Sequence, residues 1–371
     1  MRGIPPNKVG AETTKGRAMK VSRLVVVQVA VVGLMLLVAA CSPPGAKTEG
    51  QGAGSGGKKA QQDIAQASGN VCKVKPPDLK LEDAVVGFSQ SEKEVNPFRI
   101  AETESIRSEA KKRNIKELVY TNANSQASKQ ISDIRDMIAQ DVDAIIVAPL
   151  LEEGMDPALN AAKEAGVPVF LIDRETAGTP CEDYITFMGS DFLEQGKRAA
   201  DIMADLTNEK GQVAVLEGTP GASVTIDRTE GFEQQLKKYP NMEIVASQTG
   251  EFLRTKGQTV MEQLIQSNPD INVVYAENDE MALGAIQALK DAGKDPGQDV
   301  KVVSIDGTRQ AVQAIITGDI NAVIETNPRF GPLAFDTIEK FLAGKPIPQK
   351  IIVQDDVYTK KNAQESLGET Y

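Results

Sequence analysis

The chain has 371 residues, with 41 Lys and Arg, 52 Asp and Glu, three cysteines, and neither histidine nor tryptophan. The absence of histidine excludes Ser-His-Asp and Cys-His catalytic sets and every histidine-containing metal site. A formal net charge of −11 disfavours binding to nucleic-acid phosphates, so we expect no nucleic-acid partner. The length suggests two domains or one large α/β unit.

The N-terminal 40 residues differ from the rest of the chain. They contain six basic residues and one acidic residue, whereas the remainder is acidic. Residues 24–40 are apolar apart from one Gln and follow a basic segment, which is typical of a secretory signal. The stretch VAAC at 38–41 resembles the bacterial lipobox, so we expect residues 1–40 to be removed and Cys41 to be lipidated. The alternative is a permanent signal anchor with an incidental cysteine.

Two further expectations concern this region. The first 18 residues do not look like a usual signal, whereas the segment that begins at Met19 does, so we predict that translation starts at Met19. Residues 41–82 are expected to form the lipidated cysteine and a flexible linker, because Gly, Ser, Gln and Lys dominate the start of this segment without an apolar period. We therefore predict an exported protein, tethered in the periplasm or at the outer face of the cell membrane.

The remaining cysteines are Cys72 and Cys181. An exported pair can oxidise, and each cysteine lies just before a predicted strand, near the same edge of a sheet. The sequence favours a disulfide between them over two independent thiols.

From residue 83, apolar runs of five to seven residues alternate with amphipathic stretches. Such runs indicate parallel strands covered by helices on both faces. The predicted strands are 84–89, 118–121, 144–148, 167–172, 185–189, 212–217, 243–247, 272–276, 301–305 and 322–325. Because ten strands exceed a typical open sheet, we predict two doubly wound α/β lobes with parallel sheets, which bind ligands at the carboxyl ends of their strands.

Polar side chains follow these strand ends in both halves. They are Gln90, Arg99, Asp173, Arg174, Arg228, Asn278, Asp306 and Glu325. A single Asp or Asn there is usually a helix N-cap or a turn residue, and Asp191 and Asp279 fit that explanation because each directly precedes a helix. Together, however, carboxylate, amide and guanidinium groups suit neighbouring hydroxyls, and Phe98 and Phe252 offer flat apolar surfaces for a sugar ring. The pattern predicts a polyol site without a nucleophile or a metal cage.

Eight segments carry a resemblance to a known family. They are VGFSQ (86–90), PFR (97–99), FLIDR (170–174), GASVTIDR (221–228), TKGQTVMEQ (255–263), NDEMALGAIQALKDAG (278–293), SIDG (304–307) and ETNPRFGP (325–332). In this order they resemble the ribose- and galactose-binding class of bacterial ABC-transporter sugar-binding proteins (periplasmic binding protein type I), and most closely the galactofuranose-binding proteins.

The resemblance implies a fold and a site. It implies two lobes joined by three hinge segments, with 83–190 plus 327–348 in the N-terminal lobe and 191–326 plus 349–371 in the C-terminal lobe. The sugar would bind between the lobes. The matching positions imply sugar contacts from Gln90, Phe98, Arg99, Asp173, Arg174, Arg228, Phe252, Asn278, Asp306 and Glu325.

The resemblance also implies a function. We expect a monomer that captures a monosaccharide (galactofuranose, galactose, ribose or similar) and passes it to an ABC permease, without catalytic residues, metal or cofactor. The alternative is a sugar receptor that feeds a chemotaxis or sensor-kinase partner. Less favoured are a sugar-responsive transcription factor and a glycosidase using Asp173 and Asp306. Two departures from the galactofuranose-binding pattern, Phe98 for Trp and Glu277 for His, leave the sugar open.

Overall fold

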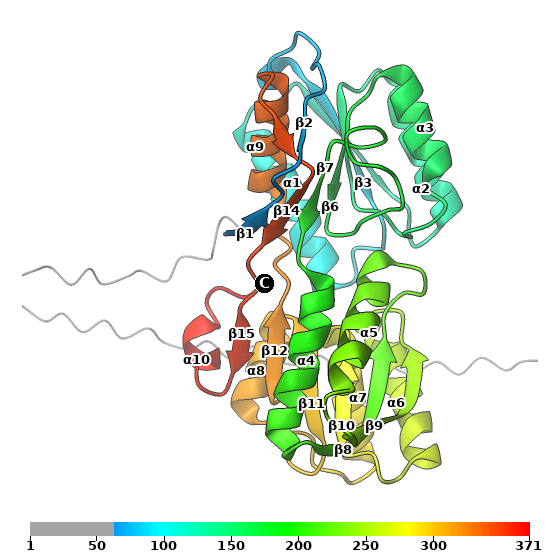
Figure 1. Ribbon diagram of the computed structural model, residues 1–371, viewed down its shortest axis with the longest axis vertical. Helices are drawn as coiled ribbons and strands as arrows, with labels where there is room; N and C mark the ends of the chain where they lie inside the picture. Colours follow the sequence, from blue (N-terminus) through cyan, green and yellow to red (C-terminus); the bar gives the residue numbers. More distant parts are fainter. Residues whose placement is uncertain (1–62) are drawn as a thin grey trace, which may run out of the picture. The chain divides into compact units, whose positions relative to one another are not determined.

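A computed structural model of the chain describes residues 63–371 (Figure 1). The predicted signal, the predicted start at Met19, the lipidation site Cys41 and the linker up to residue 62 lie outside the described residues. Between residues 63 and 371 the chain forms a seven-stranded sheet, a six-stranded sheet and a small two-stranded sheet. Each large sheet forms one α/β lobe with its helices, and every strand predicted from the apolar runs is present.

The sheet of the N-terminal lobe has the strand order β1-β14-β7-β6-β5-β3-β4. Its neighbouring strands are parallel except for the antiparallel edge pair of β1 and β14. The strands are β1 (Ile64–Ala67), β3 (Val85–Gln90), β4 (Glu117–Asn122), β5 (Ala144–Val147), β6 (Val169–Ile172), β7 (Thr186–Gly189) and β14 (Lys350–Val353). The other elements of this lobe are β2 (Val71–Cys72), η1 (Leu81–Asp83), α1 (Pro97–Lys112), α2 (Ala127–Ala139), α3 (Asp156–Ala165), α9 (Gly331–Leu342) and β13 (Ile347–Pro348).

The burial of strand β3 shows why this lobe is layered. Val86 and Phe88 join a core cluster with Ile106 of α1, whereas Val85 joins a different cluster with Ile134 of α2. Alternate residues of a strand face opposite sides of its sheet, so both faces of β3 are apolar and both are covered by helices. Polar side chains are therefore placed at the strand ends.

The sheet of the C-terminal lobe has the order β15-β12-β11-β10-β8-β9. Its strands are β8 (Lys210–Glu217), β9 (Asn241–Thr249), β10 (Val273–Ala276), β11 (Lys301–Asp306), β12 (Ala322–Glu325) and the antiparallel β15 (Val357–Thr359). Its helices are α4 (Phe192–Thr207), α5 (Ser223–Leu236), α6 (Arg254–Ser267), α7 (Asp279–Asp291), α8 (Arg309–Thr317) and α10 (Ala363–Ser366). None of the helices between residues 63 and 371 combines the length and apolarity that crossing a bilayer requires.

Helices α4 and α5 lie side by side because two glycines permit close contact (Figure 1). A Cβ atom at Gly196 of α4 would lie 2.2 Å from the backbone oxygen of Arg228 in α5. A Cβ atom at Gly231 of α5 would lie 2.0 Å from the backbone oxygen of Leu193 in α4. This close packing fixes the position of the helix that carries Arg228.

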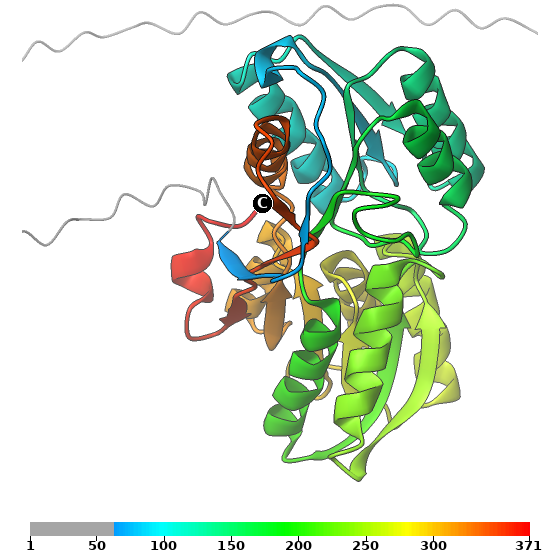
Figure 2. The same cartoon turned by 45° about the horizontal axis from the view of Figure 1, so that its top comes forward.

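The expectation of a flexible linker is wrong for residues 64–72. Strand β1 pairs with the edge strand β14, and β2 pairs with β13. Figures 1 and 2 show the blue β1 beside the red β14. Cys72 and Cys181 form a disulfide, which joins β2 to the segment before β7. The side chains of β1 are exposed, so backbone pairing fixes a segment whose composition resembles a linker.

The predicted boundary after residue 348 is also wrong. Residues 349–353 were expected in the C-terminal lobe, but β14 lies in the N-terminal sheet between β1 and β7. The chain passes between the lobes after β7, after β12 and after β14, so the third connection comprises residues 354–356. Short apolar strands of similar composition occur on both sides of this connection, and composition alone does not distinguish them.

Candidate functional site

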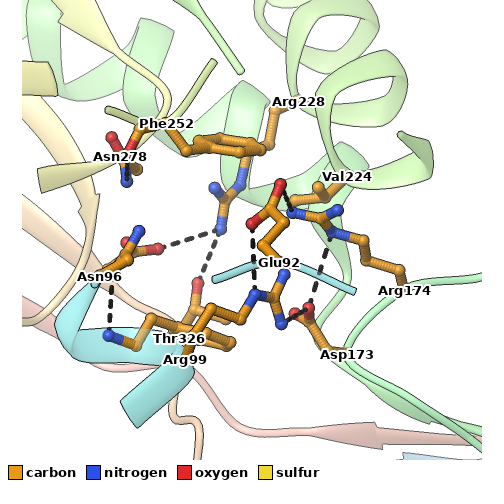
Figure 3. A pocket seen from close by; sticks show the side chains of 12 residues that line it. Glu92, Asn96, Arg99, Asp173, Arg174, Val224, Arg228, Phe252, Asn278 and Thr326 are labelled. Carbon is orange, nitrogen blue, oxygen red and sulfur yellow. Dashed lines mark hydrogen bonds and ion pairs between the residues drawn. The ribbon is translucent and has the colours of Figure 1, made fainter. Parts of the chain in front are cut away.

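A cavity lies between the lobes, at the carboxyl ends of their strands (Figure 3). Its lining comes from both lobes and comprises Glu92, Asn96, Phe98, Arg99, Asp173, Arg174, Val224, Arg228, Phe252, Asn278, Asp306 and Thr326. A ligand held in this cavity would therefore contact both lobes at once.

The cavity brings together most of the residues predicted from the sequence. The predicted residues that line it are Phe98, Arg99, Asp173, Arg174, Arg228, Phe252, Asn278 and Asp306. Gln90 and Glu325 are buried nearby but do not line it. Glu92, Val224 and Thr326 line it although the sequence did not single them out.

Gln90 lies behind the cavity and supports Glu102. Its Nε2 donates to Glu102 Oε2 (2.8 Å) and Thr103 Oγ1 (3.2 Å), while its Oε1 accepts from the Ser91 N–H (2.9 Å). Glu102 in turn accepts from Arg99 Nη1 (2.7 Å). Burial raises the pKa of Glu102 to about 7, although Arg99 opposes this change. The amide of Gln90 is thus engaged with its neighbours and orients Arg99 indirectly.

Glu325 belongs to the connections between the lobes. Its Oε1 accepts from the Tyr358 hydroxyl (2.8 Å) and its Oε2 from the Asp356 N–H (3.2 Å). The backbone N–H of Glu325 also donates to the oxygen of Asp356 (2.8 Å). The prediction that Glu325 faces a ligand is therefore not supported, because its carboxylate joins the second connection to the third.

Three carboxylates hold Arg99 of α1. Its Nη1 donates to Asp173 Oδ2 (2.6 Å) and Glu102 Oε2 (2.7 Å), and its Nε donates to Glu92 Oε2 (3.3 Å). Burial opposes the charge of this guanidinium, but the three carboxylates together raise the pKa of Arg99 well above its ordinary value. The planar group is consequently fixed in both charge and orientation.

Glu92 connects the two lobes. Its Oε1 lies 3.1 Å from Arg174 Nη2 and accepts from Thr219 Oγ1 of the C-terminal lobe (2.9 Å). Burial alone would raise its pKa, but Arg174 and Arg99 lower the pKa of Glu92 to about 2. Glu92 follows β3 by two residues, and that position was the only signal in the sequence that could have identified it.

Arg174 packs against Phe252 of the opposite lobe. Its guanidinium carbon lies 5.5 Å from the ring centroid, and its Nη1 donates to the backbone oxygen of Leu150 (3.3 Å). Its buried Nε has no hydrogen-bond partner among residues 63–371, since Asp173 Oδ2 lies 3.7 Å away. A Cβ atom at Gly218 would lie 1.9 Å from the ring of Phe252, so a side chain there would displace this ring.

Arg228 of α5 is the cation of the C-terminal half of the cavity. Its Nη2 donates to Thr326 Oγ1 (2.9 Å) and lies 3.6 Å from Asp306 Oδ1. Its Nε donates to Gln195 Oε1 (3.0 Å), and its Nη1 donates to the backbone oxygen of Glu277. Burial raises the pKa of Asp306 well above its ordinary value, against the opposing effect of Arg228.

Two asparagines in the lining are also helix N-caps. Asn96 Oδ1 accepts from the Phe98 N–H (2.9 Å) at the start of α1, and Asn278 Oδ1 accepts from the Met281 N–H (3.0 Å) at the start of α7. We expected Asp279 to be an N-cap or turn residue, but Asn278 caps α7 and Asp279 is the first residue of that helix. The carboxylate of Asp279 accepts from Ser304, Gly307 and Thr308. Asp191 does cap α4, accepting from the Glu194 N–H (2.9 Å).

The backbone is strained at three cavity residues. Asp173 has φ 63°, Phe252 has φ 58° and Asp306 has φ 133°. Residues other than glycine adopt such angles rarely, and they persist where the surrounding structure fixes them, often at ligand sites. Asp173 directly follows β6, Phe252 lies in the loop between β9 and α6, and Asp306 is the last residue of β11.

The formal charges of the lining balance. Three guanidinium groups face three carboxyl groups, together with two amides, one hydroxyl and two aromatic rings. Such a lining suits a neutral ligand that has many hydroxyls and an apolar face, because carboxylates accept from hydroxyls and guanidinium groups donate to them. Among residues 63–371, no group of three Cys, Asp or Glu residues has a geometry suited to holding a metal ion.

Residues 86–346 match the periplasmic binding protein domain. The chain belongs to the periplasmic binding protein family. This periplasmic binding protein is 40% identical over 287 residues to the galactofuranose-binding protein YtfQ of Escherichia coli K12, covering 76% of this chain and 90% of the relative. It is 36% identical over 298 residues to the ribose import binding protein RbsB of Bacillus subtilis 168, covering 78% and 94%. The family comprises sugar-binding transport proteins, not enzymes.

Solved structures show the same fold as this periplasmic binding protein. One is a protein from Mycobacterium smegmatis in complex with β-D-fucofuranose, with a TM-score of 0.74, 41% identity and coverage of 76% of this chain and 94% of that chain. Another is the binding protein of the arabinose ABC transporter of Shewanella sp. ANA-3, bound to α- and β-L-arabinofuranose, with a TM-score of 0.73, 41% identity and coverage of 76% and 94%. The predicted type I fold with two parallel-sheet lobes is confirmed.

Proposed function

We propose that this protein is an extracytoplasmic, lipid-anchored monomer that captures one monosaccharide between its lobes and delivers it to an ABC importer. The anchor is Cys41, and the segment up to residue 62 tethers the binding body near the membrane. The sugar contacts are the cavity residues named above, with Phe98 and Phe252 facing the apolar surfaces of the ring. The importer's permease in the cytoplasmic membrane is the partner.

One observation carries this proposal: the charge-balanced cavity receives its polar groups from both lobes. A charged ligand would leave this balance uncompensated, whereas the hydroxyls of a neutral sugar can bond to both signs of charge. The buried Nε of Arg174, which has no acceptor among residues 63–371, is a donor that a sugar oxygen would satisfy.

The division of the site between the lobes supports a clamp mechanism. Arg99 and Asp173 come from the N-terminal lobe, whereas Arg228 and Asp306 come from the C-terminal lobe. A sugar that bonds to both sets favours the form in which the lobes are together, since a ligand shifts a conformational equilibrium only through its differential affinity for the two forms. The permease would then recognise the form that holds the sugar.

We propose that the sugar is a furanose. The support comes from relatives and neighbours that carry galactofuranose, fucofuranose and arabinofuranose in their names or complexes. Ribose is the second candidate because of the similarity to a ribose import binding protein.

A thermal-shift screen of the full chain tests this proposal. D-galactose, D-fucose, L-arabinose and D-ribose all have furanose forms in solution, and a ligand that binds only the folded protein raises its melting temperature. We expect at least one of these sugars to raise it, while a sugar alcohol of the same carbon number does not. No shift with any monosaccharide would contradict the proposal.

The variant Arg174→Ala tests the site itself. Removing this guanidinium deletes the contact with Glu92 and the buried donor at the cavity, so we expect sugar binding to weaken by about 1–3 kcal/mol in titration calorimetry. Arg135→Ala is the matched control, because Arg135 is exposed and its one side-chain hydrogen bond within residues 63–371 goes to the backbone oxygen of Pro157. Equal affinities of the two variants would show that the cavity is not the sugar site.

A further inference from the structure

Phe98 of the cavity has an aromatic neighbour from the far end of the described chain. The ring centroid of Tyr371 lies 6.1 Å from that of Phe98, with an angle of 77° between the ring planes. This edge-to-face arrangement is a favoured geometry for two aromatic rings. Phe98 belongs to α1 of the N-terminal lobe and lines the cavity, whereas Tyr371 follows α10 and does not line it.

The backbone near Tyr371 is fixed to the C-terminal lobe. The Arg309 N–H, at the start of α8, donates to the Tyr371 backbone oxygen (2.8 Å), and Arg309 Nη1 donates to the Leu367 oxygen (3.1 Å). Arg329 Nη2 donates to the backbone oxygens of Glu369 (3.2 Å) and Thr370 (3.3 Å). Arg309 of α8 therefore attaches this segment to the C-terminal lobe, Arg329 links it to the start of α9, and the Tyr371 ring contacts a cavity residue of the N-terminal lobe.

The hydroxyl of Tyr371 reaches a connection between the lobes. It donates to the backbone oxygen of Thr326 (3.3 Å), and the Thr326 hydroxyl accepts from Arg228 Nη2 (2.9 Å). The guanidinium carbon of Arg329 lies 5.8 Å from the Tyr371 ring centroid. Tyr371 thus contacts Phe98 through its ring and Thr326 through its hydroxyl. Both of these residues line the cavity.

We propose that Tyr371 is a positioning residue for sugar binding: it sets the orientation of the Phe98 ring when the lobes are together. An aromatic ring stacks on a sugar only at a defined tilt, and Phe98 is attached to the first turn of α1, where a backing ring limits its rotation. The inference rests on the proposed sugar-binding function and adds a residue that touches no ligand.

A double-mutant cycle tests this inference, with sugar affinity measured by titration calorimetry on the full chain. The sugar is the one that gives the largest thermal shift with the wild type. Tyr371→Ala should weaken binding by about 2–10-fold, the range that corresponds to loss of one edge-to-face pair. Tyr371→Phe keeps the ring and should retain most of the affinity. In a Phe98→Ala background, Tyr371→Ala should cause no further loss, because its partner is already absent.

Control variants distinguish a wrong role for Tyr371 from a wrong assignment of sugar binding. Tyr239→Ala, which removes a tyrosine that bonds to Asp201 away from the cavity, should leave affinity unchanged. If Tyr371→Ala does not fold, Tyr371→Leu keeps the apolar volume without the ring and takes its place in the cycle. Unchanged affinity, or an equal loss in both backgrounds, would overturn the role of Tyr371 while sugar binding by the wild type stands. Failure of the wild type to bind any sugar would overturn the proposed function as well.

Discussion

Glu277 is a buried carboxyl group directly beside the cavity residue Asn278. Its Oε2 accepts from the Gly218 N–H (2.8 Å) and its Oε1 from Thr229 Oγ1 (2.6 Å). Burial raises the pKa of Glu277 to about 8, although these hydrogen bonds and the charge of Arg228 oppose the change. The resemblance to galactofuranose-binding proteins implied a histidine at this position. The chain therefore departs from that pattern by placing a carboxyl group there.

The pKa of Glu277 predicts a pH dependence of stability. Because the pKa is raised from about 4.5, the folded state favours the neutral acid. The contribution of the neutral carboxyl to the free energy of unfolding is therefore fully present below pH 4.5 and is lost as the pH rises through 8. In Glu277→Gln the amide oxygen can accept from the Gly218 N–H and the amide nitrogen can donate to Thr229 Oγ1, so the variant should remove this loss while both contacts stay satisfied. We expect the variant to exceed the wild type in free energy of unfolding by on the order of 1–3 kcal/mol at pH 8, and to approach it near pH 4.5.

Urea unfolding at a series of pH values measures this difference. Glu262→Gln, an exposed change on α6, is the matched control and should follow the wild type at every pH. If the Glu277→Gln curve instead runs parallel to that of the wild type between pH 4.5 and 8, the carboxyl does not titrate as described.

At the scale of single residues, the sequence predicted most of the cavity because motifs place residue types at strand ends. Asp173, directly after β6, and Asp306, at the end of β11, were found in this way. Glu92 was missed because its function depends on Arg174 and Thr219, which are distant in the sequence. Gln90 occupies a strand end like the others, but its partner Glu102 turns it away from the cavity.

Among the elements, α4 links the chain connections between the lobes to a residue of the cavity. Its Gln195 donates from Nε2 to Asp355 Oδ2 (2.7 Å), Thr326 Oγ1 (2.9 Å) and the Glu325 backbone oxygen (3.2 Å). Its Oε1 accepts from Arg228 Nε (3.0 Å). One buried amide therefore joins the second and third connections and also orients a cavity arginine.

Gln195→Ala should affect stability and binding together. Loss of the amide leaves several buried groups without a partner, so we expect the free energy of unfolding to fall by about 1–3 kcal/mol and sugar affinity to weaken. Gln234→Ala, an exposed change on α5, should change neither quantity. Urea unfolding and titration calorimetry check the two effects, and a normal affinity in Gln195→Ala would contradict the link between the connections and Arg228.

The hydrophobic pattern of the sequence predicted the buried strands and the amphipathic helices. β3 and β10 are buried throughout and were identified within one residue. β1 was missed because its stability comes from backbone pairing with β14, which leaves no apolar pattern in its exposed side chains. β14 was assigned to the wrong lobe because pairing partners, not composition, determine the sheet to which a short strand belongs.

At the scale of the whole molecule, the lobes contact each other through few polar groups. Besides the bond from Thr219 to Glu92, the Glu175 N–H donates to Ser223 Oγ (2.9 Å), and the Glu152 N–H donates to the Gly221 oxygen (2.8 Å). Such sparse contacts suit a clamp in which a ligand supplies the remaining interactions. The sequence predicted two lobes and the residues at their edges, but not which of these residues meet across the cavity.

Capture of a sugar between the lobes is tested by a calorimetric titration of the full chain with the sugar that the thermal-shift screen selects. We expect saturable binding of one sugar molecule per chain, with affinity weakened in Arg174→Ala and retained in Arg135→Ala, and recovery of the sugar unchanged afterwards. The absence of saturable binding by any furanose-forming monosaccharide, or conversion of the sugar to a product, would contradict this expectation.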